Sequence, residues 1–245
     1  MSVGFFNNYQ NEGRGVEKDV KTPRLLLFFQ IYFRKFWNLI LLNMLYVLFC
    51  FPIVTIGPAT AGLTKVLRNY AREEHAFLWG DFFEAFKKNF KQAFLYSLFE
   101  GIVITFLILD LLMVSNVTNQ VMVVLSLAAI FLTITVIAFM HYYIYNMMVT
   151  FRLSFKQLLK NAFIFCWAGF WRNLFTTVII IGVTIATIYL NIIGVLFVLM
   201  FLYFSFCGFL INFMVNPLIK KYMIDGFDPE TGNRLESEKY DGFEE

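Results

Sequence analysis

Charged side chains are scarce in this sequence. Only 15% of the 245 residues are Asp, Glu, Lys or Arg, whereas 59% are hydrophobic and 20% are aromatic. An average soluble domain carries about 25% charged residues. The long apolar runs exclude Lys and Arg, which cost about 2.5 to 3.5 kcal/mol each at the centre of a membrane helix. The sequence therefore predicts an integral membrane protein that has the lipid bilayer as a partner.

The basic residues gather in four stretches, at 14–35, 65–91, 152–172 and 220–239. Because cytoplasmic loops accumulate Lys and Arg, this clustering predicts a multi-pass protein of the cell membrane with all four stretches and both termini in the cytoplasm. The net charge of +3 is modest, and the basic residues flank apolar runs instead of forming a patch interleaved with aromatic residues. We therefore expect no nucleic acid among its partners.

Cysteine is rare, and the common catalytic motifs are missing. Cys50, Cys166 and Cys207 sit inside or beside apolar segments without CxxC spacing, which predicts buried free thiols and no metal or redox site. The chain has no GxxxxGK[ST], HExxH or GxSxG motif, and no GxGxxG that opens a helix after a strand. ATP hydrolysis, zinc proteolysis and serine hydrolysis are disfavoured. We expect a protein that is not an enzyme and uses no cofactor or metal.

Composition divides the chain into three parts. Residues 1–23 mix Gly, Asn, Glu and Lys and predict a flexible N-terminal arm. Residues 222–245 hold eight of the seventeen acidic residues and predict a disordered acidic tail. Residues 24–221 between them form a single integral membrane domain.

The first apolar run, 36–64, is interrupted by proline. At Pro52 and at Gly57-Pro58 a helix loses an amide donor, and the proline ring clashes with the preceding turn. We predict a helix to about Phe51, a broken passage over 52–58, and a new helix with Pro58 in its first turn. The run either crosses the membrane or returns like a hairpin. The return is favoured, because it keeps every basic stretch on one side.

Four further apolar segments follow, at 93–114, 121–143, 174–190 and 195–215. About 20 helical residues cross a bilayer core of about 30 Å, so each segment can span, the third barely. Their short, uncharged connections pair them as two hairpins with their tips outside. The predicted fold class is all-α: a polytopic helical membrane protein with a broken first segment, two transmembrane hairpins and amphipathic cytoplasmic helices.

Two cytoplasmic stretches carry helix-start signals. Asp81 to Glu84 has the form of a capping box, and phenylalanines then recur every four residues beside lysines. A comparable pattern follows Ser154 to Gln157. We predict an amphipathic helix at the membrane interface before each hairpin. The likeness fits a parallel internal repeat, and it equally fits the shared requirements of any interfacial helix.

Two acids lie inside the second apolar segment, Glu100 and Asp110. Ten residues place them about 80° apart around the helix and about 15 Å apart along it, so they form no close carboxylate pair. Asp110 is near the outer end, where it reaches headgroups. Glu100 is deeper and predicts either a functional polar site or a structural hydrogen bond to a neighbouring helix. His141, among tyrosines, fits an aromatic belt better than a proton relay.

Three short motifs follow one another in the first half of the chain. They are IVTIGPATAG at Ile53 to Gly62, REEH at Arg72 to His75, and FFEAFKKN at Phe82 to Asn89. With these motifs the chain resembles the YesL-like family of bacterial integral membrane proteins, which carry a domain of unknown function. The resemblance covers Phe28 to about Lys221. It implies a Gram-positive bacterium and a link to carbohydrate uptake, because such proteins are often encoded beside sugar ABC importers. It carries over no catalytic or binding residue.

Two functions follow as hypotheses. The first is a non-enzymatic accessory or regulatory component linked to carbohydrate ABC uptake, with sugar ABC permease subunits as its partners. The second is a small secondary transporter with a polar site formed by Glu100 and the break at Gly57-Pro58.

Overall fold

The computed structural model describes residues 23–114 and 116–225, and every regular element among them is helical. The elements are α1 (Arg24–Arg34), α2 (Phe36–Cys50), η1 (Ile53–Thr55), α3 (Ile56–Ala71), α4 (Leu78–Lys88), α5 (Phe90–Val114), α6 (Gln120–Thr150), α7 (Phe155–Ala168), α8 (Phe170–Ile188), α9 (Ile192–Val198), η2 (Leu199–Tyr203), α10 (Phe204–Ile219) and η3 (Lys220–Ile224). The predicted all-α fold class is confirmed. The predicted N-terminal arm and acidic tail lie almost wholly outside the described residues.

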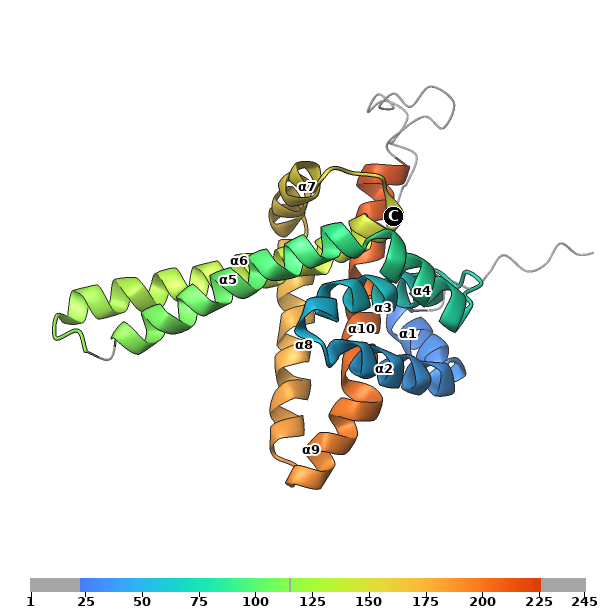
Figure 1. Cartoon of the computed structure of the whole chain (residues 1–245), viewed down its shortest axis with the longest axis horizontal. Coiled ribbons are helices and arrows are strands. Elements are labelled where there is room, and N and C mark those ends of the chain that lie inside the picture. The colour runs from blue at the N-terminus through green and yellow to red at the C-terminus, as the bar shows by residue number, and fades with distance from the viewer. Residues whose placement is uncertain (1–22, 115, 226–245) are drawn as a thin grey trace, which may run out of the picture.

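Four helices in the described part of the chain are long and apolar enough to cross a membrane, or five if the bent pair α1 and α2 counts as one span. Helices α5 and α6 run side by side as an arm that projects from the body, and α8 pairs with the continuous helix α9 to α10 (Figure 1). Helices α1 to α4 pack around the junction of the two hairpins. The two predicted hairpins are therefore present, and they diverge.

The first apolar segment folds back on itself, as predicted. Helices α1 and α2 meet at an angle of 73°, and α2 and α3 lie side by side (Figure 1). The Thr55 hydroxyl closes the turn between them by donating to the carbonyls of Phe49 at 2.6 Å and Pro52 at 2.7 Å. At the far end, Arg34 pairs with Glu73 at 2.6 Å. This ion pair brings the two ends of the segment together, as the hairpin-like return predicts.

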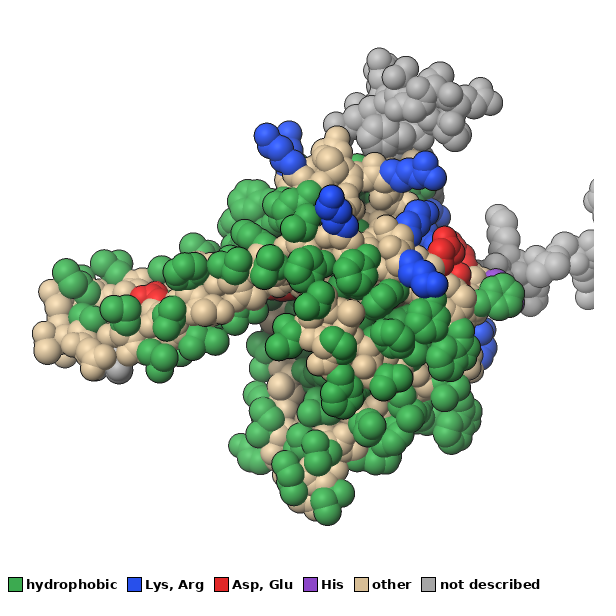
Figure 2. All heavy atoms as spheres, viewed as in Figure 1, with side chains coloured by type: hydrophobic (Ala, Val, Ile, Leu, Met, Phe, Trp, Pro, Cys, Tyr) green, Lys and Arg blue, Asp and Glu red, His purple; other side chains and the backbone are tan. Residues whose placement is uncertain are grey.

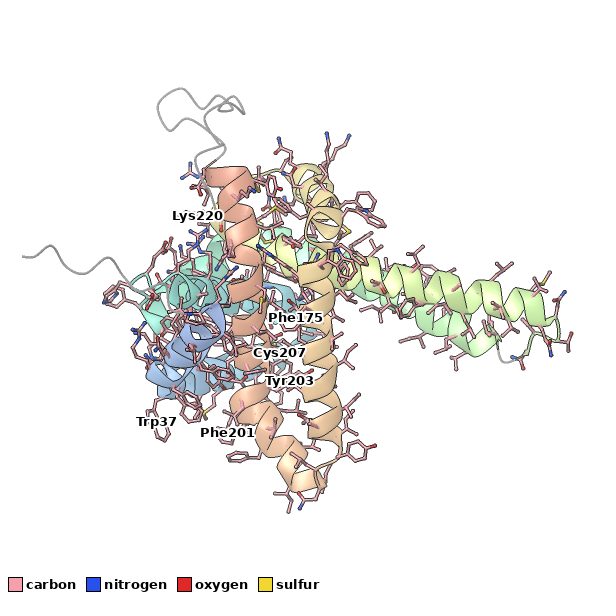
Figure 3. The ribbon with its side chains drawn as sticks, turned by 180° about the vertical axis from the view of Figure 1, so that it is seen from behind. Trp37, Phe175, Phe201, Tyr203, Cys207 and Lys220 are labelled. Atoms are coloured by element: carbon pink, nitrogen blue, oxygen red, sulfur yellow. The ribbon has the colours of Figure 1, made fainter. Side chains whose placement is uncertain are left out.

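Basic side chains gather over one end of the molecule and stay away from both hairpin tips (Figure 2). Seen from behind, Lys220 lies at that end of α10, and Phe201 lies toward the opposite end (Figure 3). In a background without the native cysteines, we expect cysteines at Arg34, Lys88 and Lys160 to resist an impermeant thiol reagent added to intact cells. Cysteines at the tip positions Thr118 and Ile192 should react, because the predicted topology puts the tips outside. Labelling of Arg34 but not Lys88 would contradict the hairpin-like return.

Helix α3 occupies the centre of the fold because its surface is made of small residues. A Cβ added at Gly57 would fall on the Ala93 carbonyl of α5, and one at Gly62 would lie 2.9 Å from the Phe82 ring of α4. On the third side, a Cβ at Gly208 of α10 would lie 2.6 Å from Leu67. Small residues let helix backbones approach closely. The GPATAG run is therefore explained by packing.

The two amphipathic helices differ from each other at their N-termini. Ser154 and Gln157 form the predicted capping box at the start of α7. The prediction at Asp81 is wrong: α4 already begins at Leu78, and the Asp81 carboxylate accepts the Phe77 amide at 3.0 Å from within the first turn. The N-cap residue Phe77 has an extended backbone and no side-chain oxygen that could accept a hydrogen bond from the first turn. The Asp81 carboxylate, which belongs to the helix itself, accepts the Phe77 amide instead.

The apolar face of α4 packs on protein. Phe82 is fully buried, and the rings of Phe82 and Phe86 lie 5.9 and 5.4 Å from Phe49 of α2. Each amphipathic helix is followed by a single-residue break, at Asn89 and at Gly169, and then by a long span. The breaks are 80 residues apart, whereas the capping-box patterns are 73 residues apart. The two halves therefore share the order of their elements, but the residues matched by the sequence pattern do not occupy equivalent positions in the two helices.

Candidate functional site

The deepest acid of the chain is paired. Glu100 of α5 and His141 Nδ1 of α6 are joined by a hydrogen bond of 2.8 Å. The Glu100 side chain is 17% exposed and the His141 side chain is 35% exposed. Glu100 lies ten residues beyond the start of α5, and His141 nine before the end of α6, which places both about 14 Å from the basic end of the hairpin. An unpaired charge at that depth is costly, and the contact provides the compensation.

Tyrosine rings enclose the imidazole of His141. Its centroid is 6.3 Å from the ring of Tyr96 and 5.1 Å from the ring of Tyr145, and those two tyrosines pack edge to face at 5.4 Å. Both tyrosines are buried. The Tyr46 hydroxyl lies 3.3 Å from the Thr60 hydroxyl on the neighbouring α2 and α3 pair. The imidazole thus lies against aromatic rings of α5 and α6, and Tyr46 and Thr60 line the same outer cavity.

Small-molecule sites in proteins usually occupy cavities of about 300 to 1,000 Å³. The outer cavity lies beside Glu100 and has a volume of about 880 Å³. It is located between the arm of α5 and α6 and the fold-back of α2 and α3. Its walls are mostly apolar, with Ile53, Val54 and Ile56 from the break on one side and Ile104 and Phe106 of α5 on the other. Glu100 and His141 are the ionisable groups along its wall, besides tyrosine.

A second, inner cavity of about 120 Å³ shares four lining residues with the outer one, namely Tyr46, Thr60, His141 and Tyr145. Its other side is closed by α10, with Cys207 and Asn212 in the wall. His141 therefore lies on the boundary between a mostly apolar outer cavity and a narrower inner one.

A chain of polar groups continues from the inner cavity toward the basic end. Asn146 donates to the Asn212 side-chain oxygen at 2.7 Å, and Thr150 donates to the Asn146 carbonyl at 2.6 Å. The buried Arg68 guanidinium then donates to the Thr150 hydroxyl at 2.6 Å. Within the described residues, Asn146 Oδ1 is buried without a hydrogen-bond partner. Such groups are rare in purely structural networks.

The structure brings together some of the predicted site residues. Glu100 lines the outer cavity together with Ile53, Val54 and Ile56 of the turn, whereas Gly57 and Pro58 are buried in α3 and do not line it. Pro52 is exposed in the turn. Asp110 lies ten residues farther along α5, in its outer part, and lines none of the cavities described here.

Sequence reasoning placed His141 in an aromatic belt, and it missed the asparagines. The tyrosines that follow His141 in the sequence bond to α8: the Tyr142 hydroxyl lies 2.9 Å from the Thr177 hydroxyl, and Tyr143 donates to the Asn173 side-chain oxygen at 2.8 Å. The buried asparagines were a readable signal, because an amide inside an apolar run requires a partner. Cys166 and Cys207 are buried free thiols as predicted, and Cys50 is half-buried and free.

These features define a multi-span helical membrane protein with a paired acid and histidine where two cavities meet, the outer of which is open at the surface. Residues 39–111, less than a third of the chain, match the family described as "Protein of unknown function, DUF624". The matched segment contains the break and Glu100, whereas His141 lies outside it. No curated protein and no solved structure matches the chain.

Proposed function

We propose that this chain is a small secondary transporter that exchanges lipophilic organic cations for protons at Glu100 and His141. The observation that supports this proposal is the composition of the outer cavity, whose mostly apolar wall carries a single carboxylate in contact with a histidine. Apolar walls accommodate a hydrophobic body, and a carboxylate beside tyrosine rings attracts a cationic head.

The exchange follows from charge. Glu100 and His141 share a proton in the empty site, and an arriving cation replaces it as the counter-charge of the carboxylate. One proton then leaves for each monovalent cation that binds, so the net charge of the site stays constant. Because cation and proton compete, the affinity for the cation should rise with pH, and the linkage is reciprocal.

Hydrogen bonds join Asn212, Asn146 and Thr150 between the inner cavity and the basic end. Asparagine does not titrate, so these side chains can line a path for the released proton but cannot carry it themselves. The proposal is non-enzymatic, since it moves a solute and a proton without making or breaking a covalent bond in the solute.

The proposal predicts gradient-driven accumulation of tetraphenylphosphonium in proteoliposomes. With an acidic interior and a neutral exterior, the wild-type chain should accumulate the cation in exchange for internal protons. Protein-free liposomes and liposomes carrying Glu100→Gln are the controls. Under the same gradient, glucose and maltose should not accumulate. Accumulation of a sugar but not of the cation would overturn the choice of substrate class.

A second proposed function is that of an accessory subunit linked to carbohydrate ABC uptake. The exposed apolar surface of the arm formed by α5 and α6 favours it. Beyond Gly101 both arm helices expose large apolar side chains, among them Phe106 at 67% and Phe131 at 74%. A surface of this kind fits lipid or the membrane helices of a permease subunit. Recovery of sugar permease subunits with the tagged chain from native membranes, lost when Phe106 and Phe131 are replaced by alanine, would support this second function.

A further inference from the structure

A separate cavity lies at the basic end, where the start of α5 meets α3, α4 and the connection between α6 and α7. Its volume is about 570 Å³. Three cationic side chains line it, Lys65 of α3, Lys88 of α4 and Arg152 of the connection, with Glu84 as the single acid. We call it the basic pocket. It shares no lining residue with the two cavities beside Glu100.

The cations of the basic pocket are not neutralised by protein. Among the described residues, none of the three forms an ion pair, whereas the nearby Arg34 and Arg72 pair with Glu73 and Glu74. Three positive charges against one negative charge leave an excess of two. A cluster of like charges around a cavity is unfavourable by itself, and a bound anion relieves that repulsion.

The walls of the pocket are fixed by hydrogen bonds. Gln92 of α5 donates to the Leu153 carbonyl at 2.9 Å and thereby holds the connection that carries Arg152. Behind the wall, the 7%-exposed Arg68 donates to Thr150, which itself lines the pocket. Burial lowers the pKa of the Arg68 guanidinium from its ordinary value, and the adjacent Arg72 lowers it further. An anion in the pocket would favour the charged form of Arg68.

We propose that the basic pocket binds a phosphate monoester or phosphodiester group. Phosphate oxygens match the donor geometry of arginine and the point charges of two lysines. Asn89 lies in the same lining, and its amide NH2 has one hydrogen left beyond the bond it donates to the Ala85 carbonyl. The volume accommodates a phosphate together with a sugar- or glycerol-sized group.

The phosphate has two possible sources, a phospholipid headgroup and a soluble phosphate ester. The pocket lies where α5 changes from a charged to an apolar sequence, which is where we expect the lipid headgroups, and basic pockets at headgroup level bind anionic lipids. The same chemistry serves a soluble ester that arrives from the cytoplasm. The experiment is therefore built with one arm for each source.

In the first arm, glucose 6-phosphate and inorganic phosphate are titrated against the full chain in neutral detergent, and binding is measured by calorimetry. In the second, the full chain is placed in nanodiscs of phosphatidylcholine with and without phosphatidylglycerol, and lipid retention is measured by native mass spectrometry. Binding in either arm that depends on the pocket supports the proposal, and the arm that responds identifies the source.

Dependence on the pocket is tested by Arg152→Gln and Lys65→Gln. Loss of one charged hydrogen bond should weaken binding by about tenfold or more. Glu84→Gln should tighten binding, because it removes the only negative charge of the lining. Lys160→Gln, an exposed lysine of α7 outside the pocket, is the matched control and should leave affinity unchanged. Absence of binding in both arms, or an equal loss with Lys160→Gln, would overturn the proposal.

Discussion

Replacing His141 with leucine is expected to lower the free energy of unfolding by about 2 to 3 kcal/mol. Breaking a fully buried ion pair by removing one partner costs about 3 to 5 kcal/mol. The expected loss is smaller because the His141 side chain is 35% exposed and because the isolated carboxyl can take up a proton. Chemical denaturation in detergent measures the loss.

The double variant Glu100→Leu with His141→Leu separates stability from function. When both partners become apolar, no uncompensated charge remains, and we expect most of the lost stability to return. Cation exchange should stay absent, because the variant holds neither proton nor counter-charge. A double variant that is as unstable as His141→Leu alone would show that the pair contributes through packing of the imidazole among Tyr96 and Tyr145.

Replacing Asn43 with leucine is expected to lower the free energy of unfolding by about 3 kcal/mol or more. Its side chain is fully buried and serves three backbone groups: it donates to the carbonyls of Leu199 at 2.9 Å and Met200 at 2.8 Å, and it accepts the Ser205 amide at 2.8 Å. These groups flank the π-helical turn η2, where the regular α-helical pairing is interrupted. Each buried backbone group left unpaired costs about 1 to 3 kcal/mol.

Asn161→Leu is the matched control for Asn43, since Asn161 is half-buried on α7 and its side chain makes no hydrogen bond to the described residues. Its stability should change by less than about 0.5 kcal/mol. A loss below about 1 kcal/mol for Asn43→Leu would mean that the turn rewinds into a regular α-helix. In that case Tyr203, whose hydroxyl lies 2.7 Å from Thr184 on α8, should lose its contact with that residue.

The pattern of charged residues along the chain predicted the architecture well. The absence of Lys and Arg from apolar runs located both hairpins, and the prolines of the first run located the fold-back between α2 and α3. These features follow from single residues acting on their own segment, through desolvation or through a lost amide donor. Such signals are local, so a sequence displays them directly.

The candidate site could be predicted only in part, because pairing depends on how helices are staggered. Glu100 stood out as a deep acid. Its partner lies 21 residues after the start of α6, whereas Glu100 lies 14 residues before the end of α5. The difference of seven residues is a stagger of about 10 Å along the hairpin, and helix packing alone determines it. The same applies to Asn43 and α10, which are joined by contacts across more than 150 residues.

The central claim is that Glu100 and His141 exchange a proton for an organic cation. The most direct test is proton release on binding. Tetraphenylphosphonium is added to the purified full chain in weakly buffered detergent solution, and a pH-sensitive dye records the protons set free. We predict about one proton per bound cation for the wild type, and none for Glu100→Gln at the same protein concentration. Cation binding without proton release from the wild type, or equal release from Glu100→Gln, would contradict the account.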